Sequence, residues 1–152
     1  MDRLNNRNGF TIVEVLVVLI LIGLIAGILF SRNHQSNAGL VSETAMLKSY
    51  LRFVQSLAMS DNTKSWALKI EANQYTLFED GAASGYNLPD AASSQRTIPA
   101  TTKVTIKSVT PADTVVFDEW GSPGAQTCTI TLGDNSNPDQ TITVTKNTGF
   151  IP

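Results

Sequence analysis

The stretch GFTIVEVLVVLILIGLIAGILF, residues 9–30, decides the architecture of this 152-residue chain. From Phe10 to Phe30 it runs for 21 residues, among which Thr11 and Glu14 are the polar side chains. As an α-helix this run would rise about 30 Å, which is enough to cross the hydrocarbon core of a bilayer. The sequence therefore predicts a membrane-spanning helix over residues 10–30.

A short charged segment, residues 1–9, precedes the apolar run and carries Arg3 and Arg7 against Asp2. Positively charged flanks of a membrane helix tend to stay on the cytoplasmic side. We therefore expect a cytoplasmic N-terminal segment and export of residues 31–152.

Three processing schemes compete for such an N-terminus. An ordinary secretory signal is cut after its apolar run, behind an Ala-x-Ala-like site, which Leu24 and Ala26 match poorly. A lipoprotein signal needs a cysteine at the end of the run, and the sequence has none there. The third scheme cuts before the run, between Gly9 and Phe10.

The residues around that third position form a recognisable pattern: Gly9, then Phe10, then a glutamate at the fifth place after the cut, then uninterrupted apolar residues. This pattern resembles the leader of type IV pilins and type II secretion pseudopilins. The resemblance implies cleavage between Gly9 and Phe10 by a prepilin peptidase and N-methylation of Phe10. It also implies that Glu14 neutralises the N-terminal amine of a neighbouring subunit and so sets the register of a filament.

The position of Glu14 gives a physical reason for such a pairing. A carboxylate in an apolar segment costs a few kcal/mol to insert into a membrane, so it needs a partner. The alternative is an incidental, protonated glutamate near the cytoplasmic interface. Gly23 and Gly27 form a G-x-x-x-G pattern that lets helices approach closely, which makes them candidate assembly residues beside Glu14.

The next segment, residues 31–59, reads as an amphipathic continuation of the helix. Its apolar positions fall near one face and are Leu40, Leu47, Leu51, Val54 and Ala58. We expect one long helix from about Phe10 to Met59, bent near Gly39, whose second half packs on a sheet.

Residues 60–152 are polar and rich in threonine, which predicts a β-rich exported domain. Alternating residues predict a hairpin of 66–71 with 74–78, and residues 80–94 predict a mobile loop. Further strands are expected at residues 102–109, 114–118, 127–132 and 141–146. The expected fold class is α+β, pilin-like, with a long N-terminal helix packed on an antiparallel sheet.

A second resemblance concerns the exported part. The order of elements and a Gly-bearing C-terminal strand at residues 148–151 are similar to the H-type pseudopilin and FimT-like minor pilin group. Members of that group implicated in DNA uptake carry a basic C-terminal segment, whereas this tail has Lys146 alone. After Phe30 nine Lys or Arg residues face eleven Asp or Glu residues, so nucleic acid is not an expected partner.

Little in the exported part suggests catalysis or metal binding. Cys128 alternates with threonines and is expected to be a buried strand residue, the alternatives being an intermolecular disulfide or a reactive thiol. The oxygen-rich residues 134–139 lack the spacing of an EF-hand, so a hairpin turn is favoured over a calcium loop. Asp118 and Glu119 are expected to point to opposite faces of a strand, a poor arrangement for an acid/base pair.

The expected function is therefore structural. The sequence predicts a minor pilin or pseudopilin of a type IV pilus or type II secretion pseudopilus, held in the bacterial inner membrane with its C-terminal domain in the periplasm before it enters the filament. Its expected partners are other pilin or pseudopilin subunits, prepilin peptidase, the inner-membrane assembly machinery and membrane lipid. No cofactor, metal or catalytic residue is expected. The alternatives are a pilus-tip binding module, as an adhesin or DNA-uptake receptor, and a membrane-anchored hydrolase, for which no G-x-S-x-G motif or second histidine is present.

Overall fold

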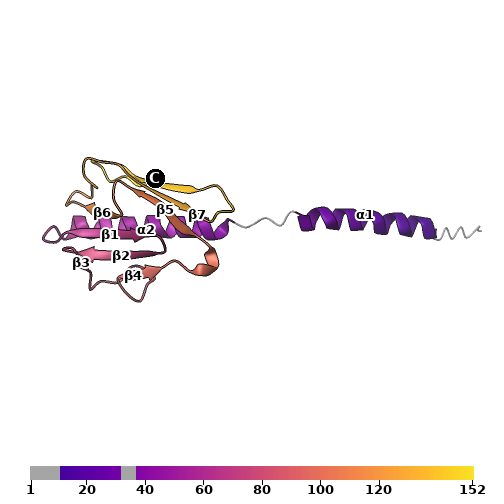
Figure 1. Ribbon diagram of the computed structural model, residues 1–152, viewed down its shortest axis with the longest axis horizontal. Helices are drawn as coiled ribbons and strands as arrows, with labels where there is room; N and C mark the ends of the chain where they lie inside the picture. The colour runs from indigo at the N-terminus through magenta and orange to yellow at the C-terminus, as the bar shows by residue number, and fades with distance from the viewer. Residues whose placement is uncertain (1–10, 32–36) are drawn as a thin grey trace, which may run out of the picture. The chain divides into compact units, whose positions relative to one another are not determined.

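The computed structural model describes residues 11–31 and 37–152, and for residues 26–31 the backbone alone. The chain divides into two units, Met1–Gln35 and Ser36–Pro152. In the first unit the described residues form helix α1, Ile12–Ser31 (Figure 1). Among the described residues, no helix is long and apolar enough to cross a membrane. The membrane span predicted over residues 10–30 is thus not found in the described part of the chain.

The second unit begins with helix α2, Ala38–Ser60, which ends where the Asp61 N–H donates to the Leu57 carbonyl at 2.9 Å. Every position of the predicted apolar face is buried, and Glu43, Thr44 and Tyr50 are buried with it. The single helix predicted from Phe10 to Met59 would need residues 32–36. These lie outside the described residues, so its continuity stays a prediction.

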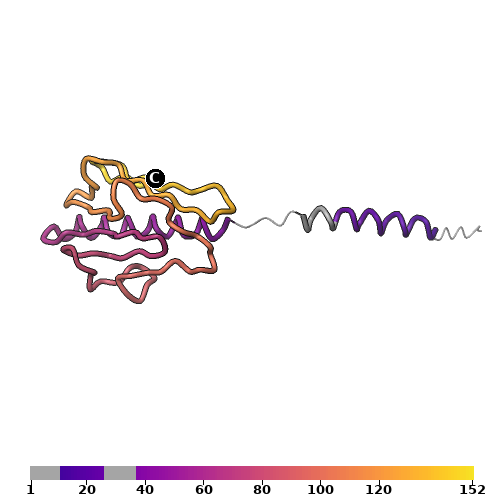
Figure 2. Tube along the Cα trace, viewed as in Figure 1, coloured from indigo at the N-terminus to yellow at the C-terminus, as the bar shows by residue number. Residues whose placement is uncertain are grey.

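Two antiparallel sheets pack on α2, where one sheet was expected (Figure 1). The five-stranded sheet has the order β3-β2-β1-β6, with β4 also paired to β2, and the three-stranded sheet has the order β5-β7-β8. Their strands are β1 Trp66–Glu71, β2 Gln74–Glu79, β3 Ala82–Ala83, β4 Gln95–Thr97, β5 Thr105–Thr110, β6 Thr114–Phe117, β7 Cys128–Gly133 and β8 Gln140–Val144. The path of the chain from α2 to the C-terminal segment can be followed in Figure 2.

The predicted hairpin is confirmed, because Glu71 pairs with Gln74 across the Ala72-Asn73 turn. One core joins α2 to both sheets, and α2 contacts β1, β6, β7 and β8. Burying this apolar surface is the main force that holds the helix on the strands. The second unit therefore has a hydrophobic core of its own.

Three local expectations differ from the structure. Residues 80–94, expected to be a mobile loop, include β3 and bury Leu88 to 2% exposure, and the Leu77 N–H donates to the Ser94 carbonyl at 2.8 Å. Strand β5 begins at Thr105 because a 3-10 turn, Ala100–Thr102, precedes it. The prediction of a C-terminal strand at residues 148–151 is wrong, because the last strand, β8, ends at Val144.

Instead of forming a strand, the C-terminal segment is fastened to α2 and to the turn after β6. The Gln55 amide donates to the carbonyls of Gly121 (2.7 Å) and Gly149 (3.0 Å), and the Arg52 guanidinium donates to the Ile151 carbonyl at 3.0 Å. Gly149 has a φ of +63°, and a Cβ there would lie 1.8 Å from the Gly121 carbonyl oxygen. The close approach of these two backbones therefore requires glycine at position 149.

The lone cysteine lies in β7 and is 3% exposed, as the alternating pattern predicted. Burial raises the pKa of the Cys128 thiol from its ordinary value of 9.0 to about 11. The thiol form therefore stabilises the fold below about pH 9, and this contribution declines as the pH rises towards 11, by up to about 1.4 kcal/mol per pH unit.

Two measurements test this behaviour of Cys128. Alkylation by iodoacetamide at pH 8 should be much slower in the folded protein than in urea. Urea unfolding between pH 8 and pH 10.5 should show a loss of stability that is smaller in Cys128→Val. Equal alkylation rates in the folded and unfolded chain would contradict the burial of this thiol.

Candidate functional site

The first turn of α1 is organised by Thr11. Its hydroxyl oxygen accepts a hydrogen bond from the Glu14 N–H at 3.2 Å, and its carbonyl accepts from the Glu14 and Val15 N–H groups at 3.1 and 3.2 Å. Thr11 is thus the N-cap of the helix, and Glu14 follows three residues later, as in a capping box. The Glu14 carboxylate is exposed at the positive end of the helix dipole.

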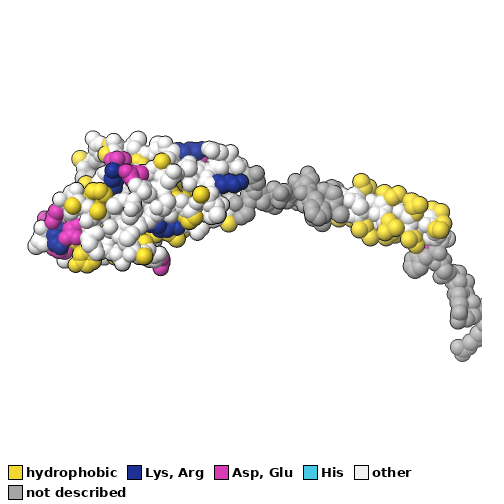
Figure 3. All heavy atoms as spheres, turned by 60° about the horizontal axis from the view of Figure 1, so that its bottom comes forward, with side chains coloured by type: hydrophobic (Ala, Val, Ile, Leu, Met, Phe, Trp, Pro, Cys, Tyr) yellow, Lys and Arg dark blue, Asp and Glu magenta, His cyan; other side chains and the backbone are white. Residues whose placement is uncertain are grey.

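From Val15 to Ile25, the part of the helix whose side chains the structure describes, α1 is apolar around its whole circumference. The large hydrophobic side chains from Ile12 to Ile25 are between 48% and 85% exposed. Figure 3 shows them covering the described part of the helix. A helix that is apolar on every side is typical of one enclosed by lipid or by other protein chains.

Of the predicted processing and assembly residues, the structure describes some and not others. Gly9 and Phe10 lie outside it. Gly23 lies in α1, and apart from its chain neighbours and the adjacent helix backbone no described atom comes within 4 Å of a Cβ built there; Gly27 lies in the same helix. Close helix approach at this glycine pair therefore stays a prediction.

A buried ion pair was missed by the sequence reading. Glu43 of α2 accepts two hydrogen bonds from the Arg96 guanidinium of β4, at 2.8 and 2.9 Å, and their side chains are 4% and 16% exposed. Glu43 lies three residues after Leu40 and four before Leu47, on the buried row of α2. That position was the one signal in the sequence that could have identified it.

Two tyrosines surround this ion pair. The rings of Tyr50 and Tyr75 meet edge to face at 5.9 Å between centroids, and the Arg96 guanidinium lies 5.9 Å from the Tyr50 ring centre. Both side chains are 0% exposed, and neither hydroxyl has a described hydrogen-bond partner. Burial raises the pKa of both phenols. The cluster has no net charge and is enclosed by protein. This arrangement suits a structural role, holding β4 on α2, better than a catalytic one.

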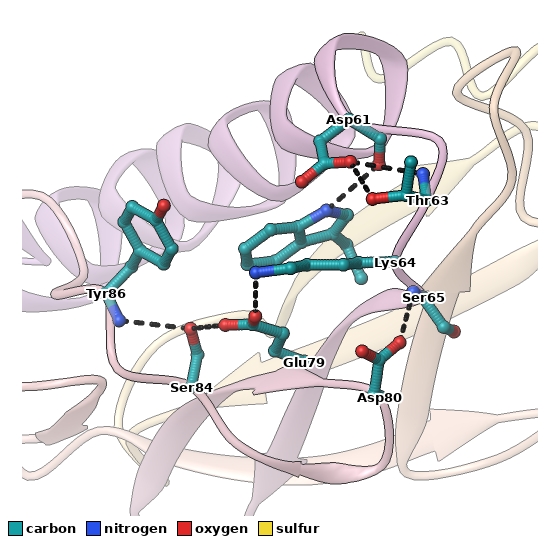
Figure 4. A network of polar contacts seen from close by, with 9 residues as sticks. Asp61, Thr63, Lys64, Ser65, Glu79, Asp80, Ser84 and Tyr86 are labelled. Atoms are coloured by element: carbon teal, nitrogen blue, oxygen red, sulfur yellow. Dashed lines mark hydrogen bonds and ion pairs between the residues drawn. The ribbon is translucent and has the colours of Figure 1, made fainter.

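A second polar network closes the end of the unit where α2 stops (Figure 4). The Lys64 ammonium pairs with Glu79, and this hydrogen bond lowers the pKa of the Glu79 carboxyl. The other Glu79 oxygen accepts from the Ser84 hydroxyl at 2.9 Å, which in turn accepts from the Tyr86 N–H at 3.0 Å. Lys64 also lies 6.0 Å from the Tyr86 ring centre.

An open hollow of about 620 Å³ lies beside this network, and its lining includes Lys64, Asp80, Asp118 and Glu119. Asp118 was expected to lie on a strand, but strand β6 ends one residue earlier, at Phe117. It follows β6 in a turn, where its carboxylate accepts from the Trp120 and Ser122 N–H groups at 3.0 and 2.7 Å.

The oxygen-rich segment after β7 is a turn. One Asp134 oxygen accepts from the backbone N–H groups of Ser136 and Asn137 at 3.0 and 2.8 Å, and the other accepts from the Asn137 side-chain amide at 2.7 Å. The Asn137 side chain lowers the pKa of the Asp134 carboxyl most, and the two backbone hydrogen bonds lower it further. Within residues 11–31 and 37–152, no group of three or more His, Cys, Asp or Glu side chains could hold a metal ion.

Comparison with known proteins identifies one segment of the chain. The family described as Prokaryotic N-terminal methylation motif matches residues 4–30. This range contains Gly9, Phe10, Glu14 and the apolar run, and it ends before the second unit, Ser36–Pro152. No curated protein and no solved structure matches the chain. The matched motif, a prepilin-type leader, supports the class of type IV pilins and pseudopilins.

Proposed function

We propose that this chain is a minor pilin or pseudopilin, a structural subunit of a type IV pilus or of a type II secretion pseudopilus. The methylation motif at residues 4–30 is the observation that carries the proposal. A prepilin peptidase removes residues 1–9 and methylates Phe10. Residues 10–30 anchor the chain in the inner membrane and then enter the filament, with the unit Ser36–Pro152 on the periplasmic side.

The first turn of α1 supports this proposal. The N-cap at Thr11 holds Glu14 at the helix start, where cleavage would place the new amine of Phe10 close by. The apolar surface of α1 leaves Glu14 as the one charged side chain between Thr11 and Ile25. In an assembled filament, the amine of a neighbouring subunit compensates this charge, and the apolar helices cover one another.

Cleavage is tested by intact mass. In a strain that contains a prepilin peptidase, the extracted chain should begin at Phe10 and carry one methyl group. Gly9→Val should leave the precursor uncut, because the branched side chain disturbs the residue before the cut. Gly23→Val is the matched control and should be processed normally. A mature terminus near Gly27, or no cleavage of the wild-type chain, would contradict the proposal.

Assembly is tested at Glu14, separately from cleavage. Glu14→Leu should be cleaved and should reach the membrane at least as well as wild type, since it removes a carboxylate from an apolar segment. Its incorporation into filaments should fall about tenfold, which corresponds to about 1.4 kcal/mol. Glu14→Asp should be partly defective, because the shorter side chain keeps the charge but loses reach.

The measurement is the fraction of chain in sheared filaments, relative to its amount in the membrane, in a strain lacking the wild-type gene. Val15→Leu is the control for an apolar change in the same turn and should assemble normally. Normal assembly of Glu14→Leu at normal abundance would mean that the carboxylate is incidental.

A further inference from the structure

Strand β6 is an open edge of the five-stranded sheet, because it pairs with β1 and with no other described strand. The Ile70 N–H donates to the Asp113 carbonyl at 2.7 Å, one step before the paired residues Lys69 and Thr114. Hydrogen-bonded and non-hydrogen-bonded pairs alternate along an antiparallel ladder. The backbone groups of Thr114 and Val116 therefore point away from β1, and no described hydrogen bond uses them.

This edge lacks the devices that protect exposed strands. The edge strand β5 carries an irregularity between Ile106 and Ser108 and a lysine, Lys107, between them. Strand β6, with the sequence TVVF, has no lysine, no proline and no described bulge. The Val116 side chain is 48% exposed. A free backbone edge of this kind is a template for another strand.

Two hollows adjoin the edge, and Val116 and Pro123 line both of them. The smaller, of about 150 Å³, includes Pro111 and Val115 in its lining. The larger, of about 620 Å³, includes the carboxylates of Asp80, Asp118 and Glu119.

The larger hollow has a negative charge excess. Its one cation, Lys64, is already paired with Glu79. The Glu119 carboxylate has no described hydrogen-bond partner, and Trp120 beside it is 78% exposed. A segment that carries positive charge would complement this end of the edge.

We propose that β6 accepts an extended segment of another polypeptide, bearing lysine or arginine, as an added antiparallel or parallel strand. The backbone groups of Thr114 and Val116 would hold the segment, and its basic side chain would enter the hollow at Asp80, Asp118 and Glu119. This is recognition by strand addition, in which main-chain hydrogen bonds supply affinity and flanking hollows supply specificity. The proposal stands on the exported unit and does not depend on the processing of residues 1–9.

The first test uses a probe peptide and the detergent-solubilised full chain. The peptide Thr-Lys-Val-Lys-Val-Thr should bind, and hydrogen exchange at the amides of Thr114 and Val116 should slow at least tenfold in its presence. The peptide with its first valine replaced by proline should bind at least tenfold more weakly, and so should the peptide with both lysines replaced by glutamate. No binding of the basic peptide at millimolar concentration would overturn the proposal.

The second test changes the edge. Val116→Pro removes an N–H that points away from β1, a position where an edge strand tolerates proline. It should weaken peptide binding at least tenfold with little change in the unfolding midpoint. Glu119→Lys should weaken binding of the basic peptide and strengthen binding of the peptide in which both lysines are replaced by glutamate. Exchange protection that appears elsewhere but not at Thr114 and Val116 in the wild-type chain would overturn the proposal without any variant.

Discussion

Replacing Glu43 with alanine should destabilise the unit Ser36–Pro152 by about 3–5 kcal/mol, because it leaves the charge of Arg96 buried without its partner. The Arg96 side chain is 16% exposed and donates both of its hydrogen bonds to Glu43. The measurement is urea unfolding of the full chain in detergent, followed by far-ultraviolet circular dichroism.

Two controls sharpen this expectation for Glu43. The ion pair Lys107–Asp139 is the control, because its side chains are 36% and 40% exposed. Asp139→Ala should therefore lower the free energy of unfolding by at most about 1 kcal/mol. The double variant Glu43→Leu/Arg96→Met should be more stable than Glu43→Ala, since it buries no uncompensated charge. A loss below about 1 kcal/mol in Glu43→Ala would show that water reaches Arg96.

A branched side chain at position 149 is the second change with a large expected effect. Gly149 has a φ of +63°, and a Cβ there would lie 1.8 Å from the Gly121 carbonyl oxygen, which is backbone and cannot turn aside as a side chain would. Gly149→Val should therefore release the C-terminal segment from Gln55 and Arg52 and expose Ile151, which is 5% exposed in the native fold. The expected loss is about 2–4 kcal/mol, from backbone strain and lost apolar burial.

The matched control is Gly81→Val, because Gly81 has a φ of +80° and, apart from its chain neighbours, no described atom within 4 Å of its Cβ position. This variant carries the backbone strain without the collision, so it should be the less destabilised of the two. Urea unfolding compares their stabilities, and proteolysis with carboxypeptidase reports release of the C-terminal segment. Equal stability losses at the two positions would mean that the contact with Gly121 contributes nothing.

The sequence predicts best what depends on neighbours along the chain. The motif around Gly9 and Glu14 is local, and the apolar face of α2 follows from helical period. The hairpin of β1 and β2 follows from alternation across a two-residue turn. Each of these could be read without knowing the fold.

What the sequence reading missed depends on contacts between distant residues. Arg96 reaches Glu43 across 53 positions, and nothing near Arg96 distinguishes it from a surface arginine. The C-terminal segment, residues 148–151, is expected to be a strand from the order of elements. It is instead held by Gln55, 94 positions from Gly149, which no local pattern indicates. The division of the strands into two sheets likewise depends on how β6 and β5 pair in space.

The two tryptophans of this chain lie at opposite extremes of exposure, 1% for Trp66 and 78% for Trp120. The ring of Trp66 meets that of Tyr86 edge to face at 5.6 Å between centroids, and its indole N–H donates to the Asp61 carbonyl at 3.3 Å. Trp120 is exposed to solvent on the turn that follows β6. The intrinsic fluorescence of the protein is therefore the sum of a component that iodide cannot reach and one that it quenches. Unfolding changes the first component, while occupation of the surface beside β6 changes the second, so the chain carries two independent optical reporters without any label.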